Sequence, residues 1–194
     1  ELPPGAVLSE AQLIEALDIG RTPIREALQR LAVEGLVEIL PRKGILVSDT
    51  NPQKQLLLLE VRRELDRLMA RTGAVRASTD EREQFNVIAD NMEAAATARD
   101  GVAFMRHDVK FNALLAAACH NEYAKRAMRL INGLSRRFWF MHFQRSADLP
   151  LCARLHANMA RAIGAGDPEG AAIGADALVD YVEVFTRATI DIAP

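Results

Sequence analysis

Gly20-Arg21-Thr22-Pro23-Ile24-Arg25-Glu26-Ala27-Leu28-Gln29-Arg30-Leu31 is the stretch of this chain that decides its fold. Apolar side chains recur at helical spacing, so that Ile24, Leu28 and Leu31 fall on one face. The polar and basic side chains of the other face are Arg21, Thr22, Arg25 and Arg30. A helix with one buried face and one arginine-bearing face is suited to the major groove of DNA.

The residues before this helix indicate a helix-turn-helix. Ser9 and Gln12 have the spacing of a capping box in front of a short helix. Residues 18–20 then form a turn. We expect Thr22 to cap the second helix, with Pro23 at its first helical position.

A basic hairpin is expected after the second helix. Short strands at residues 36–40 and 45–48 are joined by the turn Pro41-Arg42-Lys43-Gly44. The order helix, turn, helix, hairpin is typical of a winged helix-turn-helix, which ordinarily has one more helix in front. We therefore expect the first helix of this domain to lie before Glu1 and to be missing from this chain.

Specific binding of duplex DNA requires donors that reach base edges and other donors that hold phosphates. Arginine serves both purposes, because its fork fits guanine O6 and N7 as well as a phosphate. We predict that Arg25 contacts a base and that the hairpin tip enters a minor groove. The predicted DNA-binding residues are Arg21, Thr22, Arg25, Arg30, Arg42, Lys43 and Gly44. The alternative is that the arginines only solvate a surface helix.

Composition restricts the class of protein. The 194 residues are 49% apolar with a net charge of −2, which excludes a purely basic nucleic-acid module. Residues 1–50 hold five Lys or Arg and eight Asp or Glu, a net charge of −3, so DNA binding requires the cations to gather on one surface. No run reaches the roughly 20 apolar residues of a membrane span. Cys119 and Cys152 lack metal or disulfide spacing and fit a reducing cytoplasm.

Beyond a linker at residues 49–52, almost the whole chain has a helical pattern. Helix breakers and capping residues divide it, most clearly Gly166-Asp167-Pro168, where one helix ends and the next begins. The expected helices are 53–77, 79–98, 100–119, 121–146, 150–165 and 167–190. We predict a mainly α protein, with a winged helix-turn-helix at residues 1–50 and an antiparallel six-helix bundle at residues 51–194.

The motifs resemble those of a known family across essentially the whole chain. The N-terminal part is similar to the winged-helix domain of GntR-type bacterial transcription regulators, through Pro4-Gly5, Leu8-Ser9-Glu10, Arg21 to Leu28, Leu31, Glu34 to Val37 and Arg42-Lys43-Gly44. The helical part resembles the effector-binding and dimerisation domain of the FadR branch, the FCD domain, through Glu60 to Leu65, Asp108-x2-Phe111, His156 and Ala162 to Asp167. Six helices resemble the VanR-type subgroup.

This resemblance implies a cytoplasmic homodimer that binds a palindromic double-stranded DNA operator. It also implies control by a small-molecule effector, and a repressor more often than an activator. We expect the effector to be a small organic acid, a carboxylate, and the regulated genes to be catabolic.

Buried polar side chains in the expected bundle indicate a ligand pocket, because burial of a polar group costs free energy unless the group is paired. Asp108 and Asn112 lie one turn apart, and His156 lies in an apolar helix. An arginine could hold an anionic effector by charge-assisted hydrogen bonds. Neighbours such as Arg136 and Arg137, or Arg62 and Arg63, point about 100° apart, so one of each pair faces inward. The predicted effector-binding residues are Asp108, Asn112, His156, Arg137 and Arg62. The aromatic stretch around Arg137, residues 135–143, is alternatively core packing or a dimer interface.

The resemblance also implies a metal, which many such domains hold through an Asp-x3-His pair and two later histidines. Asp108 and His156 match two of these ligands, but Asn112 and Leu178 stand where the other two histidines would be. Transition metals such as zinc bind imidazole or thiolate. A divalent metal on Asp108 and His156 is therefore one interpretation, and a metal-free cluster hydrogen-bonded with Asn112 is the other.

Three functions follow from these patterns. We predict a ligand-responsive transcriptional regulator. One alternative is an architectural DNA-binding dimer without an effector. The other is an enzyme that uses Asp108 and His156 as acid and base. No Ser/His/Asp set, CxxC motif or phosphate-binding glycine loop supports catalysis, so we do not expect an enzyme.

Overall fold

The computed structural model describes residues 2–190, apart from the side chains of residues 145 and 146. These residues form two compact units. One unit consists of the chain up to Asn51 together with Gly133–Met141. The other consists of Pro52–Asn132 together with the residues from His142 onward. Within the described part of the chain, no helix is long and apolar enough to cross a membrane.

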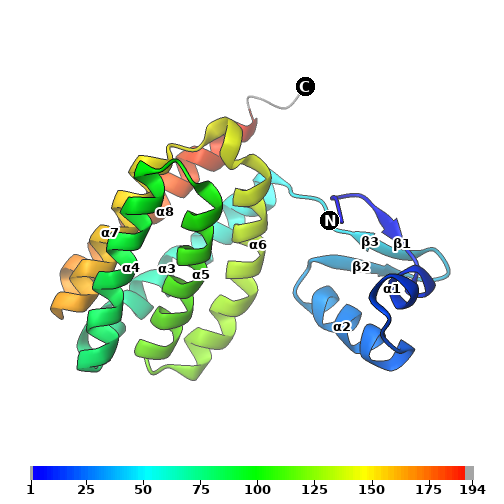
Figure 1. Cartoon of the computed structure of the whole chain (residues 1–194), viewed down its shortest axis with the longest axis horizontal. Coiled ribbons are helices and arrows are strands. Elements are labelled where there is room, and N and C mark those ends of the chain that lie inside the picture. The colour runs from blue at the N-terminus through cyan, green and yellow to red at the C-terminus, as the bar shows by residue number, and fades with distance from the viewer. Residues whose placement is uncertain (1, 191–194) are drawn as a thin grey trace. The chain divides into compact units, whose positions relative to one another are not determined.

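The first unit combines two short helices with a small sheet (Figure 1). Its elements are β1 (Val7–Leu8), α1 (Glu10–Leu17), α2 (Arg21–Val33), β2 (Val37–Leu40) and β3 (Gly44–Val47). The sheet is antiparallel in the order β1-β3-β2, with Val7 opposite Leu46 and Leu40 opposite Gly44. The predicted hairpin is confirmed as β2 and β3, and β1 is an additional strand that two apolar residues were too few to indicate.

The apolar face of α2 builds the core of this unit. Ile24 and Leu28 are buried and pack with Val37 of β2 and Ile45 of β3. Leu31, on the same side of the helix, stays 36% exposed. The amphipathic pattern of residues 20–31 therefore predicts the buried face correctly over its first two turns.

The predicted start of α2 was wrong. The helix begins at Arg21 with Gly20 as its N-cap, so Thr22 lies inside the first turn and does not cap it. Pro23 then occupies the third helical position. Proline is tolerated there because the first N–H groups of a helix have no acceptor within the helix.

The second unit is helical. Its elements are α3 (Pro52–Arg76), α4 (Thr79–Thr97), α5 (Gly101–Ala118), α6 (Glu122–Ser146), of which residues 133–141 group with the first unit, α7 (Leu149–Ala165) and α8 (Pro168–Ile190). The six expected helices are confirmed, and each end lies within one residue of the prediction. In Figure 1, α4 runs beside α7 and α3 beside α8, and α7 also packs against α8.

Local capping explains why the helix ends could be predicted. Ser78 forms a full capping box with Glu81 at the start of α4. Gly166 ends α7 in the left-handed conformation, with φ of 74°. Asp167 then accepts a hydrogen bond from the Gly170 amide at 2.9 Å. These interactions satisfy backbone groups that a helix end leaves without partners.

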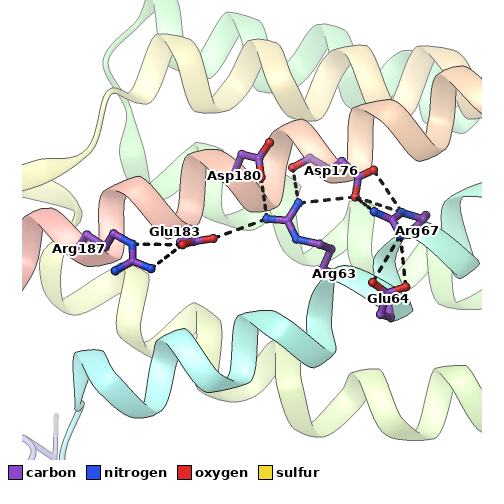
Figure 2. A network of polar contacts seen from close by, with 7 residues as sticks. All are labelled: Arg63, Glu64, Arg67, Asp176, Asp180, Glu183 and Arg187. Atoms are coloured by element: carbon purple, nitrogen blue, oxygen red, sulfur yellow. Dashed lines mark hydrogen bonds and ion pairs between the residues drawn. The ribbon is translucent and has the colours of Figure 1, made fainter.

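Charged side chains join α3 to α8 along the surface of the bundle (Figure 2). Arg63 Nη2 donates to Asp180 Oδ1 at 2.6 Å, and Arg67 Nη2 donates to Asp176 Oδ1 at 2.8 Å. Glu183 lies 3.7 Å from Arg63 and completes the same row on α8. Because exposed ion pairs are individually weak, we attribute the packing of these helices mainly to their apolar contacts, among them buried Leu59 with Val179.

Candidate functional site

The polar face of α2 is exposed. Every residue that the sequence predicts to contact DNA from this helix lies in solvent: Arg21, Thr22, Arg25 and Arg30. The buried Ile24 and Leu28 lie on the opposite face and hold the helix against the sheet. The exposed face therefore presents three guanidinium groups on a rigid support.

The N-terminus of α2 offers backbone donors to an anion. Gly20 is the N-cap, and it supplies no side-chain hydrogen bond to the helix end. The first N–H groups of α2 therefore point out of the helix with the positive end of its dipole. Such a helix end is suited to bind a phosphate, and the exposed Arg21 side chain lies at the same end.

Arg25 is held by an acidic residue of the preceding helix. Its Nε lies 2.9 Å from both Oε1 and Oε2 of Glu10, the first residue of α1. The two side chains are 58% and 33% exposed. Arg25 thus has a defined direction in the free protein.

The hairpin between β2 and β3 presents the other predicted cations. Arg42 and Lys43 are exposed, and Arg42 has a positive φ of 62°. Gly44 has φ of 107°, and a Cβ there would lie 2.5 Å from the carbonyl oxygen of Leu8. Glycine is thus needed at this position to let β1 approach β3, independently of any contact with DNA.

A buried polar cluster lies between α3, α5 and α7 of the second unit. Arg62 Nε donates to Asp66 Oδ2 at 2.9 Å, with both side chains buried. Asn112 Nδ2 donates to Asp108 Oδ1 at 2.8 Å, and Asp108 Oδ1 lies 3.4 Å from His156 Nε2. The structure therefore brings the side chains of Asp108, Asn112 and His156 together.

Arg62 faces the core and Arg63 faces α8. Arg62 is 8% exposed, whereas Arg63 joins the surface row of Figure 2. Burial alone lowers the pKa of Arg62, but the charges of Asp66 and Asp108 outweigh burial and raise this pKa. The guanidinium is therefore a buried cation. Its Nε donates a hydrogen bond to Asp66.

His156 is buried in an aromatic environment. Its Nδ1 lies 2.9 Å from the carbonyl oxygen of Cys152 and so carries a proton, because a carbonyl can only accept. Phe104 and Phe111 pack edge-on against the ring, with centroids at 5.4 and 5.8 Å. Burial lowers the pKa of His156, but the Cys152 sulfur and the Asp108 carboxylate favour the imidazolium and raise this pKa to about 10.

The side chains of the cluster do not fit a transition-metal site. His156 directs one ring nitrogen to a backbone carbonyl and the other to Asp108, while Asn112 offers an amide and Leu178 is a buried hydrocarbon. Within the described residues, no group of three His, Cys, Asp or Glu side chains is arranged to hold a metal ion. Zinc-type metals require more imidazole or thiolate ligands than this set contains.

Arg137, the other predicted effector ligand, belongs to the first unit. Its Nη1 donates to the carbonyl oxygen of Leu36 at 3.4 Å, and its Nη2 donates to that of Ser48. Burial lowers the pKa of Arg137. The structure thus places this guanidinium on backbone oxygens next to β2 and β3.

Two members of the cluster were not predicted. Asp66 lies four residues after Arg62, and Cys152 lies four residues before His156, with its Sγ 3.7 Å from His156 Nδ1. Both pairs have the i, i+4 spacing that places side chains together on a helix. This spacing was the available signal, but many surface pairs share it.

The raised pKa of His156 makes stability depend on pH. A group whose pKa is raised from 6.5 in the unfolded chain to about 10 in the fold stabilises the fold fully below the lower value. This contribution is lost as pH rises towards the upper value. We expect the free energy of unfolding to fall between pH 7 and 9.5, by at most about 1.4 kcal/mol per pH unit.

Urea denaturation of the wild type and of His156→Gln at several pH values measures this dependence. The variant is expected to have a flatter profile than the wild type. His120→Asn, which changes an exposed histidine, is the control and should follow the wild type. Parallel profiles for wild type and His156→Gln would show that His156 does not gain a proton on folding.

Two family profiles match this chain. The profile described as "Bacterial regulatory proteins, gntR family" matches residues 1–47, and the profile described as "FCD domain" matches residues 57–180. The first match covers the winged helix-turn-helix. The second covers most of the helical unit, including Arg62, Asp108 and His156.

Similar proteins are transcription regulators. The chain is 27% identical over 190 residues to a probable D-xylose utilization operon transcriptional repressor of Paenarthrobacter nicotinovorans, covering 97% of this chain and 81% of that protein. It is 31% identical over 128 residues to the HTH-type transcriptional regulator Mce2R of Mycobacterium tuberculosis, covering 57% and 53%. This chain spans less than two thirds of the length of several curated relatives.

A solved structure shares the fold. The McbR/YncC structure from E. coli has a TM-score of 0.76 with 18% sequence identity, and the match covers 98% of this chain and 88% of that one. At this identity the likeness concerns the fold alone.

Proposed function

Since this chain belongs to the GntR family of bacterial regulatory proteins and carries an FCD domain, we propose that it is a DNA-binding transcriptional regulator that represses catabolic genes in response to a small organic acid. The observation that carries this proposal is the exposed cationic face of α2 above the buried Ile24 and Leu28. The name of the Paenarthrobacter relative, a probable repressor of a sugar utilization operon, agrees with this role.

We propose that α2 enters the major groove and the β2–β3 hairpin contacts a minor groove. Arg25 reads a guanine, while Arg21, Thr22 and the end of α2 hold a phosphate. Arg30 lies further along the helix and contacts the backbone of the DNA. This division supports specific binding despite the net negative charge of residues 1–50, because all five cations of this segment are exposed and available to the duplex.

The effector site that we propose is the buried cluster between α3, α5 and α7. The terminal nitrogens of Arg62 form a fork of the kind that binds a carboxylate. Asn112 and His156 both contact Asp108 Oδ1 and supply further polar groups. A metal is not part of this proposal, and elemental analysis of dialysed protein tests that point. Stoichiometric zinc or another transition metal would contradict it.

Effector control requires a difference in affinity between two states. The effector must bind one arrangement of the DNA-reading domain and the helical domain better than another. We propose that residues 49–53, which join α3 to β3, are the joint at which this arrangement changes.

A screen of organic acids by thermal shift tests the effector class. Binding to the folded state raises stability by RT ln(1 + [L]/Kd), about 2.7 kcal/mol at 100 times Kd. We expect the melting temperature to rise with a carboxylate for the wild type and not for Arg62→Met, provided that the variant folds. A broad screen without any hit would favour the DNA-binding dimer that has no effector.

We further propose that the regulator is a homodimer that binds a palindrome, and that α3 contributes to the interface. Leu57, Val61, Leu68 and Val75 are 42–67% exposed on α3. Their intervals of four, seven and seven residues place them on one face. When the α3 helices of two subunits pack antiparallel about a two-fold axis at Leu68, Val61 lies opposite the partner's Val75.

The charges on this face agree with the same pairing. Antiparallel packing about Leu68 sets Glu64 opposite the partner's Thr72, one residue along the helix from the partner's Arg71. Both side chains are exposed: Glu64 is 69% and Arg71 is 54% exposed. Opposite charges at neighbouring levels favour a self-complementary, isologous interface.

We expect Leu68→Glu to produce a monomer. The new carboxylates of the two subunits would meet at the two-fold axis and repel each other. The interface would also lose the apolar contact of the Leu68 side chains. Size-exclusion chromatography with light scattering measures the mass. Val87→Glu, an exposed valine on α4, is the control and should remain a dimer. If both variants keep the same dimeric mass, the interface lies elsewhere.

A further inference from the structure

The contact between Glu10 and Arg25 connects the two helices of the helix-turn-helix. Arg25 Nε is 2.9 Å from each carboxylate oxygen of Glu10, so the N–H of Nε points between them. Because a guanidinium is planar, fixing the direction of its Nε–H also limits the plane of its terminal nitrogens. A single contact therefore orients the whole head group.

This contact leaves the base-reading part of Arg25 available. The guanidinium has five N–H groups, and four of them are on Nη1 and Nη2. Within residues 2–190 those four donate to no protein acceptor. They form the fork that fits guanine O6 and N7.

Glu10 itself is held in place by its neighbours. It is the first residue of α1, directly after the N-cap Ser9. Ser9 and Gln12 form a reciprocal capping box, with Gln12 N to Ser9 Oγ at 3.2 Å and Ser9 N to Gln12 Oε1 at 2.9 Å. The backbone from which the Glu10 carboxylate extends is thus fixed.

We propose that Glu10 is a positioning residue that aims Arg25 at a guanine. This inference rests on the proposed function, since it assigns a role within DNA recognition. A carboxylate near DNA repels phosphates, so Glu10 weakens general attraction to the duplex. Glu10 instead orients the Arg25 side chain before DNA binds. Arg25 then loses less conformational entropy when it contacts the base, which strengthens discrimination between bases.

The contact is expected to act on specificity more than on folding. Both side chains are substantially exposed in the free protein, where ion pairs contribute little. In a DNA groove, less water surrounds the pair and the interaction strengthens. Removal of Glu10 should therefore change base discrimination without a comparable loss of stability.

Selection from a random-sequence duplex pool, followed by anisotropy titration of single-base variants, tests this role. The position read by Arg25 is the one at which Arg25→Ala loses discrimination. We expect Glu10→Ala to reduce discrimination at that same position by about 3- to 10-fold, a part of what a bidentate pair supplies. Glu10→Gln should retain more of the base discrimination than Glu10→Ala, because its amide oxygen can still accept a hydrogen bond from Arg25 Nε.

Glu15→Ala is the matched control, since it removes the same charge from an exposed position on α1. It should leave discrimination unchanged. If Glu10→Ala keeps the full base discrimination of the wild type, Glu10 does not position Arg25. Tighter binding with unchanged discrimination would likewise overturn the positioning role, and would show that Glu10 acts only by repelling phosphates or by holding Arg25 away from DNA. A wild-type protein that selects no sequence would contradict the proposed function itself, which is a distinct result.

Discussion

Asp66→Ala is expected to destabilise the helical unit by about 3–5 kcal/mol, the range for breaking a buried ion pair from one side. Asp66 accepts from Arg62 Nε at 2.9 Å, and the two side chains are 4% and 10% exposed. The variant would leave a buried guanidinium without its hydrogen-bond acceptor. Urea denaturation followed by far-UV circular dichroism measures the change.

Asp176→Ala provides a matched comparison at the surface. Asp176 also accepts from arginine, through Arg67 at 2.8 Å, but its side chain is 31% exposed (Figure 2). We expect the free energy of unfolding to fall by at most about 1 kcal/mol, because water can solvate the released guanidinium. Equal costs for the two variants would mean that the Arg62–Asp66 pair is not a buried pair in solution.

Arg25→Ala is expected to remove about 1–3 kcal/mol of base discrimination, or roughly 5- to 150-fold, at one position of the operator. The physical reason is the loss of the paired hydrogen bonds from the guanidinium fork. Affinity for unrelated duplexes should change little. Anisotropy titrations against the selected duplex and against its single-base variants measure the ratio.

Arg30→Ala is the control for this prediction. Arg30 is exposed on α2 and, as a phosphate contact, should affect all sequences alike. We expect weaker binding to every duplex and a salt slope smaller by about one. An Arg25→Ala variant with unchanged affinity and an unchanged salt slope would exclude the proposed major-groove role.

Much of the fold follows from short-range patterns. The buried face of α2 was predictable because Ile24 and Leu28 recur at helical spacing beside charged residues. The ends of the bundle helices were predictable because Ser78, Gly166 and Asp167 act locally on the backbone. In contrast, β1 is a strand because it pairs with β3. Its two residues are too few to show the alternation of apolar and polar side chains that would predict a strand.

The site was less predictable because it depends on long-range geometry. The spacing of four residues predicts that Asp108 and Asn112 lie on one helix face. Which of Arg62 and Arg63 is buried depends on how α3 is rotated about its axis against its neighbours, and the sequence does not determine this rotation. Arg137 was assigned to the pocket from an aromatic context, and the structure places it on the carbonyls of Leu36 and Ser48. The contact of Glu10 with Arg25 spans two elements, so no local spacing indicates it.

Sequence-specific DNA binding through α2 can be measured as a single ratio of affinities. The measurement is the affinity of the wild-type protein for its selected duplex relative to a scrambled duplex of equal length, at one fixed salt concentration. We predict a ratio of at least about 1,000, the lower bound for specific regulators. Equal affinity for the two duplexes would contradict it.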